Sequence, residues 1–459
     1  MSVSDLSAGQ RRVVLLLFLG VVAVLALTAG FVVTSMRGLE RATATAPSPF
    51  SSPPTPFATP SPSPPAPVIS AEGPWSQVQA ARLFDQIGRQ VEALRGLSPR
   101  AEVPLNFLDG REMAALLDQL NVERGLEGQL EPYAALGLLP DAPVALEAHE
   151  AAAIYVFEQD QLYAVIHEQQ GGIDDQVLLA HAYAHALQDQ TFDLEAVGAR
   201  AATTDAALAG RALVEGDATL LTALYRYGDV GAADWEYLAS LILLAERPSY
   251  GEVLDSSEVW TRLERFPYWE GRRFAAALFE AGGWDAVDRA YTNPPRSSEQ
   301  VLHPERYLGE PDAPTGVGLP NLGGVLGEGW SLLLEDTLGE FAVGLYLDQT
   351  LPEEAAWQAA DGWDGDTFVV WEREDGARVR VWRIIWDTTA EAAEFEQAMI
   401  TLIPQRFLPA SPVEAPAGVE GRWWETEGGG VAISRVARYV TLVYAPDLDV
   451  LGGVVRALP

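Results

Sequence analysis

Two histidines four residues apart are the first residues in this sequence that could do chemistry. His181 and His185 lie in "LLAHAYAHALQDQTFDL", residues 178–194, of a 459-residue chain with five histidines. On a helix this spacing places both imidazoles on one face, so both can reach one zinc ion at ~2.0–2.1 Å. In the H-E-x-x-H pattern of zinc hydrolases, the glutamate after the first histidine takes a proton from the attacking water. Here that position holds Ala182, which accepts no proton.

A third metal ligand is available further along the chain. A catalytic zinc site needs three protein ligands and an open position. Glu215 lies in "RALVEGDATLL", residues 211–221, inside a predicted helix. Before the histidine helix, two β-rich runs at 152–157 and 162–167 flank a polar turn and predict a hairpin. The expected order is therefore strand, strand, histidine helix, acidic helix.

Three ordered segments carry a family resemblance. The chain has "HAYAHALQDQTFDL" (181–194), "EGDA" (215–218) and "NPPRSSEQVLHPERYL" (293–308). Over residues 75 to 310 it resembles the gluzincin zinc metallopeptidases, especially small secreted or membrane-anchored bacterial members. Those proteins carry "HE..HALQDQ.FDL", then "EGDA", then "PP.S.EQ.LHP..Y".

The resemblance implies a zinc site and also marks a departure from the family. Matched by position, His181, His185 and Glu215 correspond to the zinc ligands, and Ala182 stands at the base position. Losing a general base typically costs ~10²–10⁴ in rate. Metal binding does not need that base. The resemblance therefore implies a catalytically impaired pseudopeptidase that keeps its zinc, with no catalytic residue at position 182.

Other polar residues are candidates for supporting roles. Asp189 lies on the helix face of His185 but ~6 Å further along the axis, so a hydrogen bond to an imidazole from outside the ligand shell is expected. His303, in "LHP", and Tyr268, in "FPYWEG", are auxiliary candidates that could stabilise an oxyanion. The alternatives are a structural hydrogen bond for His303 and core packing for Tyr268. The histidine pair itself could also be packing residues without a metal.

Composition excludes several functions. Acidic residues outnumber basic ones by 65 to 30, which gives a net charge of −35 and excludes nucleic acid as a partner, because its phosphates would be repelled. The chain has no cysteine, so it has neither disulfides nor thiolate ligands. Asp361, Asp364 and Asp366 in "DGWDGD" could offer oxygens to calcium, but a turn before a strand is the alternative.

The N-terminal region predicts attachment to a membrane. Residues 13–34 form an uncharged apolar run long enough to span ~30 Å as a helix. We interpret this run as a signal anchor, with a cleaved signal peptide as the alternative. Residues 1–12 are then a cytoplasmic tail, and residues 35–73 a linker rich in Pro and Ser. This places a single-pass protein in the cell membrane with its large domain extracytoplasmic.

The predicted fold class is α+β. Residues 74–310 should form a mostly helical, gluzincin-like domain with a β-hairpin, and residues 311–325, rich in Pro and Gly, a linker. Residues 326–459 should form a smaller α+β domain. In it, "TFVVWEREDGARVRVWRIIW" predicts a hairpin around Asp375-Gly376, "TAEAAEFEQAMITLI" a helix, and residues 422–445 two or three strands. Most of its tryptophans should lie in the core.

Three functions follow from these observations. The first is a membrane-anchored, extracytoplasmic pseudopeptidase that binds zinc and a peptide or protein along the hairpin edge. The second is an active but slow zinc metallopeptidase with a substitute base. The third is a non-enzymatic envelope protein, structural or binding, that holds no metal and binds through its C-terminal domain.

Overall fold

The computed structural model describes residues 77–123, 126–139, 153–165, 172–227, 256–310 and 312–459. The predicted signal anchor at 13–34 and the linker at 35–73 lie outside these residues. Among the described residues, no helix has both the length and the apolar character needed to cross a membrane. The fold is α+β, which confirms the predicted class.

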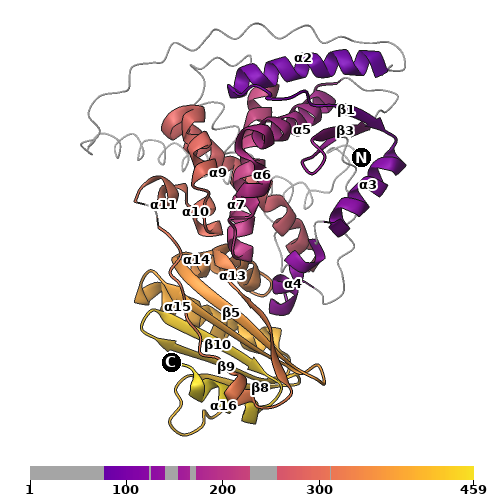
Figure 1. Cartoon of the computed structure of the whole chain (residues 1–459). Coiled ribbons are helices and arrows are strands. Elements are labelled where there is room, and N and C mark those ends of the chain that lie inside the picture. The colour runs from indigo at the N-terminus through magenta and orange to yellow at the C-terminus, as the bar shows by residue number, and fades with distance from the viewer. Residues whose placement is uncertain (1–76, 124–125, 140–152, 166–171, 228–255, 311) are drawn as a thin grey trace, which may run out of the picture. The chain divides into compact units, whose positions relative to one another are not determined.

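The first part of the chain is mostly helical (Figure 1). Helix α9 contains two helical segments, because the backbone at Gly282 and Gly283 is not helical. The helices of this part are α2 (Gln77–Arg95), α3 (Gly110–Glu123), α4 (Leu126–Leu136), α5 (Ile173–Phe192), α6 (Leu194–Gly198), α7 (Thr204–Tyr227), α9 (Ser256–Thr292), α10 (Ser298–Leu302) and α11 (Pro304–Leu308).

A three-stranded sheet lies beside these helices. Strands β2 (Ala153–Val156) and β3 (Gln161–Val165) pair antiparallel, which confirms the predicted hairpin. Strand β1 (Leu105–Leu108) pairs parallel with β3, giving the order β1-β3-β2. Among the described strands β2 therefore lies at the edge of the sheet, and it contacts α5.

The second part of the chain forms a seven-stranded antiparallel sheet in the order β4-β5-β6-β10-β9-β8-β7. The predicted hairpin is confirmed, because β5 and β6 flank a turn in which Gly376 has a φ of 84°. The strands are β4 (Trp330–Asp336), β5 (Trp363–Arg373), β6 (Arg378–Trp386), β7 (Ala410–Val413), β8 (Arg422–Thr426), β9 (Gly429–Val436) and β10 (Tyr439–Ala445).

The second part of the chain also contains helices. The predicted helix near 389–403 is α15, which begins after a capping box formed by Thr388 and Glu391. The tryptophan prediction is confirmed for the central strands, because Trp363, Trp382 and Trp386 are fully buried. The helices are α12 (Gly323–Leu326), α13 (Gly339–Asp348), α14 (Glu353–Ala360), α15 (Thr389–Arg406) and α16 (Leu448–Ala457).

The helical part and the seven-stranded sheet share one hydrophobic core. Phe266 of α9 packs on Phe341 of α13, with ring centroids 4.2 Å apart. The segment predicted as a linker is hydrogen-bonded to β5, since Thr315 donates its N–H to the carbonyl of Asp364 at 2.6 Å. The described part of this segment, residues 312–325, is thus attached to the sheet at Thr315.

Candidate metal centre

Helices α5 and α7 carry the residues of the candidate centre and contact each other. His181 and His185 lie one turn apart on α5, and Glu215 lies on α7. Ala182 is 2% exposed and belongs to a core cluster with Leu162 of β3 and Val91 of α2. Packing around Ala182 therefore holds α5 against α2 and the three-stranded sheet.

A close helix crossing positions Glu215. A Cβ on Gly216 would lie 2.1 Å from the carbonyl oxygen of Gly271 on α9, and a Cβ on Gly271 would lie 2.2 Å from that of Ala212. Only glycine permits this backbone approach. The crossing brings α9 against α7 directly beside Glu215, and Tyr268 of α9 with it.

Three ligand atoms converge in the geometry that zinc requires. Glu215 Oε2 lies 3.2 Å from His181 Nε2 and 3.2 Å from His185 Nε2, and the two nitrogens are 3.1 Å apart. Around a tetrahedral ion with bonds of 2.0–2.1 Å, ligand atoms are about 3.3 Å apart. Atoms that all carry lone pairs repel at such distances unless a cation or a proton lies between them. The donor set therefore fits zinc.

Gln188 sets the orientation and the tautomer of one ligand. Its side-chain nitrogen donates to the carbonyl of Val214 at 3.1 Å, so its oxygen is available to accept. His185 Nδ1 lies 2.8 Å from that oxygen and donates to it. With the proton on Nδ1, the lone pair of Nε2 faces the centre, as a metal ligand requires.

The charges at the centre favour an ionised carboxylate. Burial acts to raise the pKa of Glu215, but His185 and His181 outweigh it and hold that pKa well below its usual range. Burial lowers the pKa of His181. Burial also acts to lower the pKa of His185, but the charge of Glu215 and hydrogen bonds raise it. Glu215 is therefore in the form that binds a metal.

Asp189 does not make the predicted bond to an imidazole. Its carboxylate accepts from the hydroxyl of Tyr155 at 3.0 Å and from the N–H of Leu194 at 3.1 Å. It thereby ties the end of α5 to β2 and to the start of α6. The hydrogen bond to His185 comes instead from Gln188, three residues further along α5. On a helix, side chains three residues apart lie on the same face, as do side chains four residues apart.

Tyr268 is the predicted auxiliary residue that lies at the centre. Its ring centroid is 6.1 Å from that of His181. The charge of Glu215, together with burial, raises the pKa of Tyr268, while Arg211 acts to lower it. A phenol with a raised pKa stays protonated, so Tyr268 can donate a hydrogen bond and is a poor base.

His303 lies in a different cluster. Its Nε2 is 3.0 Å from Oε1 of Glu340, and the third member of the cluster is Asp361. The structure therefore does not bring His303 to the candidate zinc centre, and the imidazole contacts Glu340 instead. Neither Glu340 nor this cluster was predicted.

The calcium alternative for "DGWDGD" is not supported by the geometry of its aspartates. The carboxylate of Asp366 accepts from the backbone N–H groups of Leu338 and Gly339, at the start of α13. Asp364 pairs with Arg438 at 3.3 Å. Because the carboxylates have different partners, the described contacts bring no three of these oxygens to one point.

Replacing Gln188 by methionine is expected to weaken zinc binding about 10- to 100-fold. Methionine has a similar length but cannot accept from His185 Nδ1, so the imidazole loses its fixed tautomer. Competition with a fluorescent zinc chelator measures the affinity. Gln190→Met is the matched control, because the Gln190 side chain bonds to Arg100 and Ala101. Equal affinities for both variants would contradict the assignment.

Comparison with known proteins matches a family model to the C-terminal part of the chain. A family model described as a domain of unknown function (DUF8575) matches residues 332–455, about a quarter of the chain. This segment lies within the C-terminal part, and the metal centre lies outside it. No curated protein and no solved structure matches the chain.

Proposed function

We propose that this protein is a zinc-binding pseudopeptidase, which holds a peptide or protein segment beside the metal without cutting it. The observation that carries this proposal is the convergence of His181, His185 and Glu215 within 3.2 Å, with Ala182 at the base position. Anchoring through residues 13–34, with the large domain extracytoplasmic, is part of the proposal and rests on the sequence alone.

The donor set supports zinc over other ions. Two neutral imidazoles and one carboxylate from two helices match the ligands of catalytic zinc sites, whereas calcium and magnesium prefer oxygen ligands. When bound, zinc acts as a Lewis acid that polarises a carbonyl or a water molecule. Gln188 orients His185 toward it, and the helix crossing at Gly216 holds Glu215 in place.

The absence of a base at the centre supports binding without hydrolysis. Within the described residues, the cluster contains one carboxylate, Glu215, which is itself a ligand. Ala182 offers only a methyl group, and Tyr268 is held protonated by its surroundings. Without a proton acceptor beside the metal, attack by water is slowed by ~10²–10⁴.

The edge strand supports a peptide as the ligand. Within the part of the chain that the structure describes, β2 pairs only with β3, and it contacts the histidine helix α5. Its other side offers backbone groups to which an extended peptide can add as a further strand. A peptide bound in this way would run beside the metal centre.

A slow metallopeptidase is the second candidate, and Tyr268 is the observation that favours it. A protonated phenol beside His181 could donate to the oxyanion of a tetrahedral intermediate. This candidate requires zinc-dependent turnover by the wild type. A metal-free envelope protein, the third candidate, requires that the histidines bind no zinc.

Metal analysis of the purified full-length chain tests the proposal. Glu215→Gln removes the anionic ligand at constant size and is expected to lose one equivalent of zinc relative to the wild type. Glu280→Gln, at an exposed position on α9, is the matched control and should keep it. Equal zinc content in the wild type and Glu215→Gln would overturn the centre and leave the metal-free alternative.

A further inference from the structure

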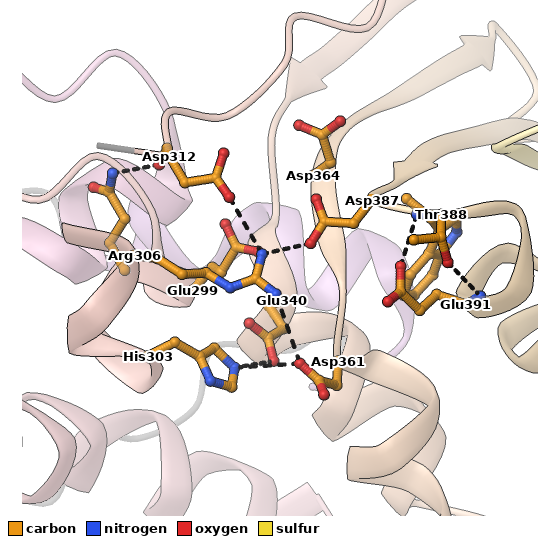
Figure 2. A network of polar contacts seen from close by, with 12 residues as sticks. Glu299, His303, Arg306, Asp312, Glu340, Asp361, Asp364, Asp387, Thr388 and Glu391 are labelled. Carbon is orange, nitrogen blue, oxygen red and sulfur yellow. Dashed lines mark hydrogen bonds and ion pairs between the residues drawn. The ribbon is translucent and has the colours of Figure 1, made fainter. Parts of the chain in front are cut away.

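A second cluster of ligand-type side chains joins three elements away from the first centre. His303 lies between α10 and α11, Glu340 lies in the first turn of α13, and Asp361 directly follows α14. Nε2 of His303 is 3.0 Å from Glu340 Oε1 and 3.7 Å from Asp361 Oδ1. Figure 2 shows the imidazole and the two carboxylates turned toward one another.

One carboxylate oxygen of Glu340 has no hydrogen-bond partner among the residues that the structure describes. The side chain is 3% exposed, and its Oε1 lies 3.0 Å from Nε2 of His303. The second oxygen, Oε2, is buried and has no hydrogen-bond partner within the described part of the chain. A buried carboxylate oxygen that lacks a partner destabilises the folded state, because the oxygen has lost its hydrogen bonds to water. This oxygen therefore calls for a cation or a donor.

Arg306 lies beside the cluster and supplies positive charge to it and to neighbouring carboxylates. Arg306 is the guanidinium of the network in Figure 2, and its hydrogen bonds go to other carboxylates. These are Glu299 at 2.7 Å, Asp387 at 2.6 Å and Asp312 at 3.4 Å. Burial raises the pKa of Glu299 to about 10, so this carboxyl is protonated near neutral pH and accepts from Arg306 without adding a negative charge. Arg306 Nη2 also lies 4.0 Å from Asp361 Oδ1, so this one arginine is shared among Asp312, Asp361 and Asp387 and cannot balance the charge of all of them.

We propose that His303, Glu340 and Asp361 bind a second divalent transition-metal ion, with zinc as the ion to test. Ligand-atom separations of 3.0 and 3.7 Å bracket the ~3.3 Å expected around a four-coordinate zinc ion. An imidazole nitrogen beside two carboxylates favours such an ion over calcium or magnesium. Asp361 is 62% exposed, which leaves a route for the ion from solvent.

The position of this second site gives it a structural role. Glu340 and Asp361 lie inside the segment matched by the family model, 332–455, and His303 lies in the helical part before it. An ion held by all three residues would fasten the α10–α11 junction to α13 and α14. This inference is independent of the pseudopeptidase proposal, because it shares no ligand with the first centre.

Zinc titration of the full-length chain after removal of metal by a chelator tests the second site. We expect the wild type to bind two equivalents and Asp361→Asn and His303→Asn to bind one each. Glu215→Gln also loses one, from the other centre, so zinc should still raise its Tm, whereas a variant carrying Glu215→Gln and Asp361→Asn should not respond. Asp364→Asn is the matched control and should bind two.

The alternative is an ion-pair network in which a protonated His303 balances Glu340. In that case Asp361→Asn retains all the zinc of the wild type, and zinc does not raise the Tm of Glu215→Gln. Either result overturns the second site. Asp361 is exposed, so Asp361→Asn keeps the test decisive even if His303→Asn fails to fold. If zinc is lost only in Glu215→Gln, the second site is wrong, and the assignment of the first centre still stands.

Discussion

Replacing Ala182 by glutamate is expected to raise the rate of zinc-dependent peptide cleavage by ~10²–10⁴-fold over the wild type. The new carboxylate would follow His181 directly on α5 and supply the missing proton acceptor. Ala182 is 2% exposed, so the larger side chain must displace neighbours. Cleavage of a fluorogenic peptide library, with and without a chelator, measures the effect.

Ala182→Gln is the control for this prediction, since it adds the same volume without a basic carboxylate. It should remain as slow as the wild type, and thermal unfolding of both variants shows whether they fold. If the wild type already cleaves at a rate comparable to that of Ala182→Glu, the pseudopeptidase proposal is wrong. The second candidate function, a slow metallopeptidase, is then supported. If Ala182→Gln gains as much as Ala182→Glu, proton transfer is not the cause.

Replacing Gly216 by alanine is expected to lower the free energy of unfolding by about 2–3 kcal/mol or more and to weaken zinc binding. The added Cβ would meet the carbonyl oxygen of Gly271 at 2.1 Å, a backbone atom that cannot rotate away as a side chain can. Helices α7 and α9 must then separate, which displaces Glu215. Denaturant unfolding and zinc titration measure the two effects.

Gly210→Ala is the matched control on the same helix. A Cβ there meets nothing within 4 Å, and alanine has the higher helix propensity, so stability should rise by roughly 0.5–1 kcal/mol. Should Gly216→Ala match the wild type in stability and zinc affinity, the crossing of α7 and α9 would not be what positions Glu215.

The features that could be predicted from the sequence have short-range signals. The hairpin of β2 and β3, the turn at Gly376 and the capped helix α15 each arise from patterns within about twenty residues. The convergence of His181, His185 and Glu215 was expected from helical spacing and from the family resemblance. Its geometry comes from a helix crossing that the sequence shows only as two unremarkable glycines.

The features that could not be predicted depend on distant partners. Strand β1 pairs in parallel with β3. Parallel strands are not joined by a tight turn, so the sequence has no local turn signal that would predict this pairing. His303 and Glu340 meet although they are 37 residues apart, with no repeat or motif connecting them. At the first centre, Gln188 and Asp189 both share a helix face with His185, and only the packing of α5 on α7 decides that Gln188 makes the bond.

The hydrophobic core that α9 shares with α13 has a consequence for producing the C-terminal region alone. Besides the packing of Phe266 on Phe341, Arg262 of α9 pairs with the buried Asp348 of α13 at 2.5 Å. A fragment trimmed to residues 332–455 would lay bare an aromatic face and leave that carboxylate without its counter-charge, and such surfaces promote aggregation. We therefore expect that a fragment limited to the matched residues 332–455 aggregates, and that a fragment including α9 does not.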